Sequence, residues 1–259
     1  MIEVSNLTKK YGDHIAVDHL SFRVEKGQIY GFLGPNGAGK STMLNMIAGV
    51  YPVDSGSIII DGEDVTRLPE HKRAKYLGRV FQDPMMGTAA DMWIEENMAL
   101  ASRRGQRRGL KWAINKSERE DFKKMLSELD LGLEDRLSAK VGLLSGGQRQ
   151  ALTLLMAVMK KPKLLLLDEH TAALDPKTAA KVLALSDKFI AEDKLTAMMI
   201  THNMKDAISY GNRLIMMNNG QIILDVSGEE KKKLTVEYLL EAFSKLSGAE
   251  FTNDRALLN

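Results

Sequence analysis

Eight consecutive residues, Gly34–Ser41 with the sequence GPNGAGKS, have the types and spacing of a phosphate-binding loop. Glycines let backbone N–H groups turn inward toward phosphate oxygens with no Cβ in the way. Lys40 adds a charge that can reach the β and γ phosphates, and Ser41 offers a hydroxyl to Mg²⁺. A helix beginning at Lys40 would present its positive end to the same anion. An ordinary glycine-rich turn is the alternative, and the strand-like run before the loop argues against it.

Two carboxylates, Asp168 and Glu169, end the apolar run 164–167. A buried strand would deliver them to the carboxyl edge of a parallel sheet, where open α/β sheets bind ligands. There Asp168 can hold the hydration shell of Mg²⁺, and Glu169 can accept a proton from an attacking water. An acidic pair can also simply end a strand. Beside a phosphate loop, the sequence favours the catalytic interpretation.

A third motif, Leu144–Gln150, has the sequence LSGGQRQ. A serine hydroxyl, two flexible glycines and a following helix predict another anion site, although Ser-Gly-Gly can also be only a helix cap. Two half-sites for phosphate in one chain suggest that two copies bind ATP between them, head to tail.

Apolar patterns predict the elements that position these motifs. Apolar and polar residues alternate over Ile15–Val24, which is typical of a half-exposed antiparallel strand. An uninterrupted apolar run at Ile29–Leu33 is typical of a buried strand, and strand signals return at 163–167 and 195–200. A helix predicted over 176–191 separates the last two, so parallel pairing is expected on the sheet that carries the phosphate loop.

Further elements follow from local signals. The expected elements are a helix over Lys40–Ala48 closed by Gly49, a strand over Ser57–Ile60 ending in an Asp61-Gly62 turn, and a hairpin in which Asn218-Asn219-Gly220 joins Leu214–Met217 to Gln221–Leu224.

Helical periodicity dominates from Pro84 to Lys160, where a capped helix is expected to begin at Ser117 and to bury Phe122, Met125, Leu126 and Leu129. We therefore expect an α/β protein with a mixed, mainly parallel sheet, an antiparallel β portion and an α-helical subdomain. The predicted nucleotide-binding core comprises 1–84 and 161–233, the helical subdomain with the LSGGQ motif comprises 85–160, and a C-terminal helix and tail comprise 234–259.

Bulk composition excludes several classes of function. The 36 basic and 34 acidic residues give a net charge of +2, so the chain lacks the strong overall positive charge that would indicate a nucleic-acid partner. The absence of cysteine excludes disulfides, cysteine nucleophiles and thiolate metal sites. No run approaches the ~18 apolar residues of a membrane span, and the first residues lack a signal-peptide pattern. Any membrane role is expected to depend on a partner.

With these motifs in order, the chain resembles the ATP-binding subunits of ABC transporters over nearly its whole length. The phosphate loop, the Leu144–Gln148 signature and Asp168-Glu169 occur in the family's order and spacing. The resemblance implies a P-loop NTPase fold of the ABC ATPase type, with ATP and Mg²⁺ as cofactors and two copies in an ATP-sandwich dimer. It also implies separate membrane permease subunits, indirect work with a substrate-binding lipoprotein, and a peripheral location at the cytoplasmic face of the membrane.

The resemblance further implies roles for single residues. Tyr11 is similar to the aromatic that stacks on adenine, Gln82 to the glutamine that touches Mg²⁺ and the attacking water, and His202 to the histidine that senses the γ-phosphate. A surface tyrosine and a structural histidine are the alternatives. Asp175 ends a loop, 172–175, that resembles the one crossing to the other subunit's site.

The complete implied site is larger. Its implied nucleotide contacts are Tyr11, Asn36, Gly37, Ala38, Gly39, Lys40, Ser41, Thr42, Ser145, Gly146, Gly147, Gln148 and Asp175. Its implied catalytic residues are Glu169, His202 and Gln82, and its implied Mg²⁺ ligands are Ser41, Gln82 and Asp168.

Two segments need separate interpretations. Most family members carry proline where this chain has His170, which frees the backbone φ angle and adds an N–H beside Glu169. The imidazole either tunes the neighbouring carboxylate near neutral pH or simply shapes the turn. The basic run Arg103–Lys111 is either a solvated loop or a contact with anionic lipid heads or a permease rim.

The segments DEHTAALD, QDPMMGTA and the Arg-Arg-Gly run resemble a bacterial group of tryptophan/tyrosine-type uptake systems. One nucleotide-binding domain without a membrane span indicates separate permeases, the usual importer arrangement. An exporter subunit for a drug or lipid is the alternative. A soluble ABC ATPase of DNA repair would need a long coiled-coil insertion before the signature, and a translation-type member would carry two ATPase domains.

Overall fold

The structure is a computed structural model that describes residues 1–106 and 114–247. The chain divides into two compact units. Unit 1 comprises 1–73, 166–169 and the described residues from 196 onward, and unit 2 comprises 74–165 and 170–195. The domain boundaries predicted from the sequence remain a proposal.

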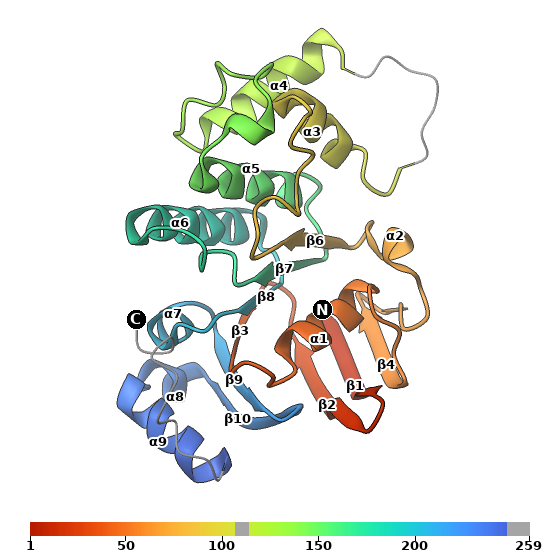
Figure 1. Cartoon of the computed structure of the whole chain (residues 1–259), viewed down its shortest axis with the longest axis vertical. Helices are drawn as coiled ribbons and strands as arrows, with labels where there is room; N and C mark the ends of the chain where they lie inside the picture. Colours follow the sequence, from red (N-terminus) through yellow and green to blue (C-terminus); the bar gives the residue numbers. More distant parts are fainter. Residues whose placement is uncertain (107–113, 248–259) are drawn as a thin grey trace. The chain divides into compact units, whose positions relative to one another are not determined.

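An antiparallel sheet of unit 1 has the strand order β2-β1-β4-β5, and Figure 1 shows its strands β2, β1 and β4. Its strands are β1 (Ile2–Tyr11), β2 (His14–Val24), β4 (Ser55–Ile60) and β5 (Glu63–Asp64). β1 pairs antiparallel with both β2 and β4. The predicted strand is confirmed, and burial alternates over its second half, where Leu20, Phe22 and Val24 are buried while Ser21 and Arg23 are exposed. In its first half the alternation fails, because Ala16 and Val17 are both buried.

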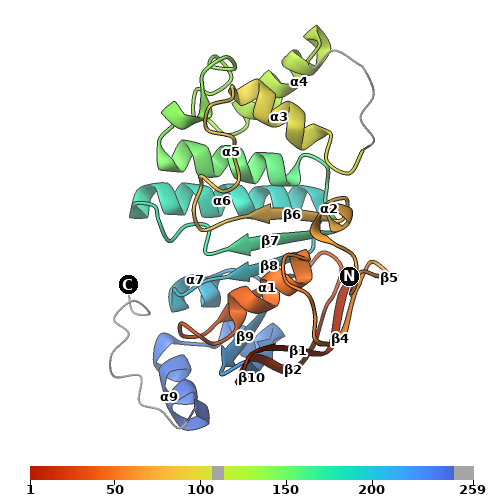
Figure 2. The ribbon, with the colours of Figure 1, turned by 45° about the vertical axis from the view of Figure 1, so that its right-hand side comes forward.

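The larger sheet carries the phosphate loop. Within unit 1 its order is β10-β9-β3-β8, followed by the last residues of β7 (Leu164–Asp168), and Figure 2 shows β7 beside β8. β3 (Ile29–Leu33) is parallel to β8 (Ala197–Ile200) and to β9 (Arg213–Asn218). The predicted hairpin is confirmed: β10 (Gln221–Ser227) returns antiparallel through Asn219 and Gly220, whose φ angles of 45° and 78° suit a tight hairpin turn.

Helix α1 (Lys40–Ala48) begins and ends where its sequence predicts. Gly49 closes it in the left-handed conformation with φ of 84°, a backbone state that glycine adopts without a Cβ clash. The short helix α2 (Glu70–Arg73) adds a second closure, because Arg73 Nη1 donates to the carbonyls of Met46 and Ile47 at 2.7 and 2.8 Å.

The C-terminal part of unit 1 contains α7 (Met204–Ser209), α8 (Gly228–Lys232) and α9 (Val236–Ser247). Leu239 and Phe243 of α9 are buried in a cluster with Leu33, Met204 and Leu214. The predicted amphipathic helix after Leu234 is confirmed, and it packs its apolar face on the core beneath the phosphate-loop strand.

Unit 2 contains the strand β6 (Leu77–Val80) beside β7, whose first two residues belong to this unit. Its helices are α3 (Ile94–Ser102), α4 (Lys116–Ser127), the 3₁₀ turn η1 (Val141–Leu143), α5 (Gly146–Val158) and α6 (Pro176–Asp193). Between Pro84 and Lys160, the described residues form helices and a single isolated bridge, Trp93 with Lys140. The predicted helical character of this segment is confirmed.

The predicted cap of α4 at Ser117 is wrong by two residues, and the helix begins at Lys116. Asn115 caps the helix, because its Oδ1 accepts from the Glu118 N–H at 2.9 Å and Glu118 Oε2 accepts from the Asn115 N–H at 3.0 Å. Both Asn115 and Ser117 have a glutamate three residues on, and asparagine ranks at least as high as serine at this position. Of the predicted apolar face, Phe122, Leu126 and Leu129 are buried, whereas Met125 is only half-buried.

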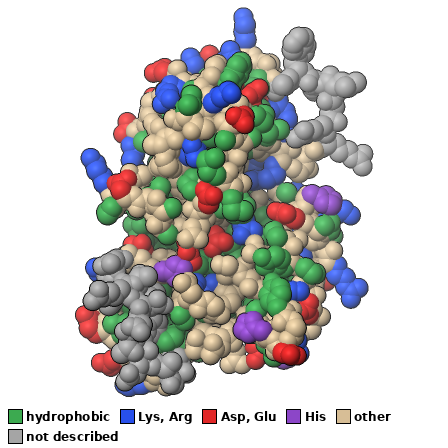
Figure 3. Space-filling model, viewed as in Figure 1, with side chains coloured by type: hydrophobic (Ala, Val, Ile, Leu, Met, Phe, Trp, Pro, Cys, Tyr) green, Lys and Arg blue, Asp and Glu red, His purple; other side chains and the backbone are tan. Residues whose placement is uncertain are grey.

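No described helix has the length and apolarity required to cross a bilayer. Basic and acidic side chains are interspersed over the face drawn in Figure 3, in keeping with the small net charge. The fold is α/β with a mixed sheet, as the sequence predicts.

Candidate active site

The loop between β3 and α1 has the backbone that a phosphate-binding loop requires. Gly37 and Gly39 have φ angles of 80° and 92°, in the region that favours glycine. A Cβ on Gly39 would lie 2.3 Å from the Ala16 carbonyl oxygen, so only glycine fits there. Lys40 Nζ donates to the carbonyls of Gly34 and Pro35 at 2.7 and 3.0 Å, which closes the loop around its own lysine.

Lys40 is buried, and its ammonium group would be stabilised by a bound anion. Burial lowers the pKa of its ammonium to about 8, against the opposing effect of Glu169 and Asp168. A phosphate group beside Nζ would favour the charged form. The site therefore gains electrostatic stabilisation when an anion enters.

Glu169 lies where β7 ends, in a backbone conformation that is rare for its residue type. Its φ is 47°, in the left-handed region. Its N–H donates to the Ile200 carbonyl at 3.0 Å, which ties the end of β7 to β8. Its buried carboxylate contacts the imidazole Nε2 of His202, which follows β8. Two neighbouring strands thus bring a candidate base and a candidate histidine into contact.

These groups surround one pocket of unit 1, with a volume of about 260 Å³. The residues that line it are Tyr11, His14, Ala16, Asn36, Gly37, Ala38, Gly39, Lys40, Ser41, Thr42, Glu169 and His202. The structure therefore brings together most of the predicted site residues of this unit. Asp168 is not among the described residues that line this pocket. Its negative charge nevertheless raises the pKa of Lys40, against the effect of burial.

Sequence reasoning missed His14 and Ala16. Both lie on β2 directly after the turn that follows Tyr11, so the hairpin that carries the predicted aromatic carries them too. The only available signal was this proximity in sequence, since neither residue belongs to a motif.

Tyr11 ends β1 with 46% of its surface exposed. Its ring meets Tyr51 edge-on at 6.3 Å between centroids, and Lys9 Nζ lies 5.5 Å from its centroid. These contacts hold a largely exposed aromatic beside the loop. Stacking on adenine stays a prediction.

The other predicted site residues belong to unit 2. Gln82 is exposed in the turn after β6. Ser145 and Gln148 cap α5 reciprocally, because each accepts a hydrogen bond from the other's backbone N–H at 3.2 Å. Asp175 caps α6 by accepting from the Thr178 N–H at 3.1 Å. None of these is among the described residues that line the unit 1 pocket.

The two glycines of the signature lie at the start of α5. A Cβ on Gly147 would lie 2.1 Å from Thr178 Cγ2, so α5 and α6 approach too closely there for a side chain. A Cβ on Gly146 would meet Leu174 at an ordinary 3.6 Å. Gly147 therefore has a packing role inside unit 2, in addition to any contact with nucleotide.

His170 is buried and bonds away from Glu169. Its Nε2 lies 3.0 Å from Ser186 Oγ, which itself donates to the Val182 carbonyl, so the imidazole donates in this pair. Burial lowers the pKa of His170 to about 4, so the ring is neutral at neutral pH. Of the two interpretations, the structure supports the one in which His170 shapes the turn.

The basic run lies partly outside the described residues, which end at 106 and resume at 114. At its start, Arg103 pairs with Glu118 at 2.8 Å, and Arg104 donates to the Ala157 carbonyl at 2.8 Å. These two arginines hold helices of unit 2 together. A contact of the run with anionic lipid heads or a permease rim stays a prediction.

The donor set fits Mg²⁺. The described residues contain no group of three or more His, Asp or Glu that could hold a metal on its own. Nucleotide-dependent sites bind Mg²⁺ through one or two carboxylates and the substrate phosphates. The Ser41 hydroxyl in the first turn of α1 and the Asp168 carboxylate at the end of β7 are ligands of this kind.

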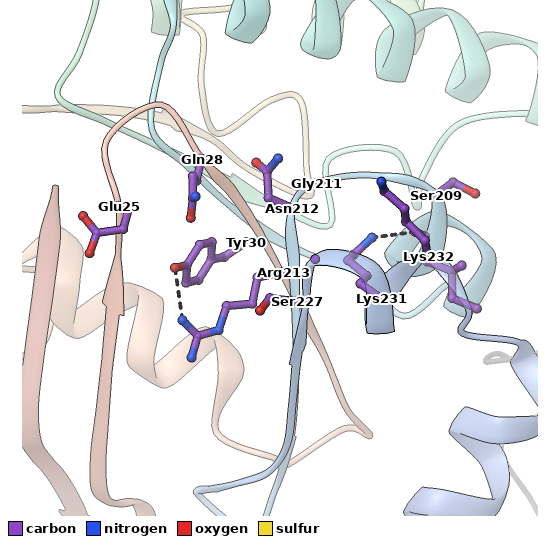
Figure 4. Close-up of a pocket in the computed structure, with 12 residues that line it drawn as sticks. Glu25, Gln28, Tyr30, Ser209, Gly211, Asn212, Arg213, Ser227, Lys231 and Lys232 are labelled. Carbon is purple, nitrogen blue, oxygen red and sulfur yellow. Dashed lines mark hydrogen bonds between the residues drawn. The ribbon is translucent and has the colours of Figure 1, made fainter.

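A second cavity of unit 1, of about 620 Å³, is larger (Figure 4). Figure 4 shows the Arg213 guanidinium pointing toward the Tyr30 hydroxyl, to which it donates at 3.2 Å, and Arg213 also pairs with Asp225. Lys231 Nζ donates to the carbonyls of Ile208 and Tyr210. These cations already bond within the protein, so the smaller phosphate-loop pocket is the better candidate for chemistry.

Comparison with known proteins identifies the family. The family described as ABC transporter matches residues 17–172. The chain is 44% identical over 248 residues to a tyrosine transport ATP-binding protein of Clostridioides difficile (strain R20291), which covers 94% of this chain and 98% of that protein. The chain belongs to the ABC transporter family. It is an ABC ATPase, the ATP-binding subunit of a transporter.

Two further similarities bear on this ABC ATPase. It is 35% identical to the spermidine/putrescine import ATP-binding protein PotA of Clostridium acetobutylicum, over 92% of this chain and 66% of that protein. It superposes with a TM-score of 0.75 on the dimeric post-hydrolysis structure of the ATP-binding cassette MJ0796 bound to ADP and Pi, at 28% identity over 88% of this chain and 98% of the other. The predicted P-loop NTPase fold of the ABC ATPase type is confirmed.

Proposed function

We propose that this ABC ATPase powers the uptake of a small solute, of the aromatic amino acid class, through separate membrane permease subunits. The observation that supports hydrolysis is the unit 1 pocket, where the phosphate loop, Glu169 and His202 meet. The cargo class is supported by the 44% identity to a protein named for tyrosine transport. The direction is supported by the similarity to a protein named for import.

Hydrolysis requires little covalent work from the protein, because in-line attack of water on the γ-phosphate depends mainly on positioning and charge neutralisation. The backbone N–H groups of Asn36–Lys40 and the Lys40 ammonium bind the phosphates. Glu169 orients the water and accepts its proton. His202 holds the Glu169 carboxylate through the contact between their side chains.

Ser41, Asp168 and Gln82 are the residues that would hold Mg²⁺. When bound, the ion supplies positive charge against the β and γ phosphate oxygens. The protein contributes a hydroxyl, a carboxylate and an amide, which are ordinary oxygen ligands for this ion.

Each active site is proposed to need two copies of the chain. Ser145 and Gly147 of a second copy close over the γ-phosphate, and Asp175 lies in the loop that reaches the other copy's site. The dimeric structure of MJ0796 supports this arrangement, since the similarity to that cassette covers 88% of the present chain. Opening and closing of the dimer then moves permeases at the cytoplasmic face of the membrane, with a substrate-binding lipoprotein acting outside.

Uptake of radiolabelled tyrosine and tryptophan tests the cargo and the direction. We expect cells whose only copy of this gene encodes Glu169→Gln to lose uptake of one of them, while uptake of an unrelated amino acid stays unchanged. Unchanged uptake of both, or slower efflux from preloaded cells, would count against an importer for aromatic amino acids. The genes beside this one offer an independent check, since a secreted binding lipoprotein accompanies import.

A further inference from the structure

The backbone at Glu169 is held in an unfavourable conformation. A non-glycine residue with φ of 47° persists only where its surroundings hold it in place. On one side, the Glu169 N–H is fixed by the Ile200 carbonyl at 3.0 Å. On the other side, Glu169 is joined by its peptide bond to His170, so the groups that hold His170 also restrain the backbone of Glu169.

His170 is fixed at both its carbonyl and its side chain. Gln150 Nε2 donates to the His170 carbonyl at 2.7 Å. The His170 imidazole bonds Ser186 Oγ on α6 at 3.0 Å. All three residues are almost completely buried, so water cannot replace either bond.

Gln150 makes a second bond of the same kind. The same Nε2 donates to the Phe81 carbonyl at 3.0 Å, and Phe81 directly precedes Gln82. One amide on α5, two residues after Gln148, is thereby bonded to the segment that follows Glu169 and to the segment that precedes Gln82.

The orientation of this amide follows from its partners. Gln150 is fully buried, and its Oε1 has no hydrogen-bond partner among the described residues. Flipping the amide would place that oxygen against two carbonyl oxygens and lose both bonds. The observed orientation keeps both hydrogen bonds from Nε2 and leaves Oε1 without a donor. An unsatisfied acceptor is uncommon among buried polar atoms. A buried group with this cost points to a role for the two donated bonds.

We propose that Gln150 is a positioning residue for ATP hydrolysis. Through one amide it bonds the signature helix α5 to the residue that follows Glu169 and to the residue that precedes Gln82, while the bond from His170 to Ser186 ties the first of these residues to α6. The proposal rests on the proposed role of Glu169 as the general base.

Two substitutions separate positioning from packing. Gln150→Met keeps the length and volume but has no donor, so turnover is expected to fall roughly 10- to 100-fold, the scale of a misplaced catalytic group. The affinity for ATP, measured by nucleotide titration, is expected to stay within about threefold of wild type, since Gln150 does not line the pocket. The matched control is Thr153→Val, at another buried position of α5, which removes the hydrogen bond from Thr153 Oγ1 to the Arg149 carbonyl and is expected to keep wild-type turnover.

Gln150→Glu tests the hydrogen bonds through the pH dependence of turnover, which a packing role would not change. A protonated carboxylic acid can donate one hydrogen bond, whereas an ionised carboxylate would face two carbonyl oxygens with no donor. The turnover of Gln150→Glu relative to wild type is therefore expected to fall as pH rises. The ratio for Gln150→Met is expected to stay low and flat.

Wild-type turnover in folded Gln150→Met, or a flat ratio for Gln150→Glu, overturns the proposal. If Gln150→Met does not fold, as judged by thermal melting, the pH dependence of Gln150→Glu decides alone. Glu169→Gln is measured in the same assay: wild-type turnover there refutes the proposed base, whereas an inactive Glu169→Gln beside a fully active Gln150→Met refutes only the coupling.

Discussion

Glu169 carries the most demanding role proposed at the scale of single residues. Its carboxylate is buried, contacts His202 and lines the phosphate-loop pocket. We expect Glu169→Gln to lower turnover by about 10² to 10⁴, because an amide cannot accept the proton of the attacking water. ATP binding should survive, since glutamine keeps the shape. Phosphate release and nucleotide titration measure the two properties separately, and wild-type turnover would refute the assignment.

Lys40 gives nucleotide binding a predicted pH dependence. The pKa of its ammonium is about 8 without nucleotide, and bound phosphates raise it. Below pH 8 the lysine is charged before and after binding, so affinity is flat. Above pH 8 binding must take up a proton, so the affinity for ADP is expected to weaken by up to about tenfold per pH unit.

Titration of ADP without Mg²⁺ between pH 6.5 and 9.5 measures this dependence. Lys40→Arg is the control, because a guanidinium stays charged over this whole pH range. The affinity of this variant for ADP should therefore show no change of slope near pH 8. Lys40→Ala should bind more weakly throughout. A wild-type affinity that is independent of pH across this range would contradict the expectation.

Arg73 shows how one side chain stabilises an element. Its buried guanidinium donates to the last carbonyls of α1 and to the carbonyls of Leu68 and Thr66. Arg73→Met would leave these acceptors without partners, so we expect the free energy of unfolding to fall by roughly 3 kcal/mol. Urea denaturation measures it. Arg67→Met, at an exposed position six residues earlier, is the matched control and should change little.

Elements whose signals are local could be predicted well. Helix α1 runs from Lys40 to Ala48 as expected because a glycine at each end sets its limits. The β9–β10 hairpin formed as expected because Asn219 and Gly220 favour a tight turn. The start of α4 was mispredicted because Asn115 and Ser117 each precede a glutamate by three residues, and local pattern alone could not choose between two equivalent capping signals.

At the scale of the whole molecule, the proposal requires two chains for each reaction. We expect Glu169→Gln to elute as a dimer with ATP and as a monomer with ADP, since only the triphosphate reaches Ser145 and Gly147 of a second copy. Size-exclusion chromatography with light scattering measures the mass. Lys40→Ala should stay monomeric in both nucleotides. Monomers that hydrolyse ATP at a rate per molecule independent of dilution would refute the sandwich.

The linear order of residues was enough to predict the phosphate loop, the acidic pair and the family, because a loop of this kind depends on the backbone preferences of neighbouring residues. It could not reveal that Glu169 touches His202, that His14 and Ala16 line the pocket, or that His170 turns toward Ser186. Nor could it connect Gln150 with Phe81 and His170, 69 and 20 residues away. Contacts of this kind form only when distant segments are packed together with water excluded, and burial then decides the charge of Lys40 and of His170.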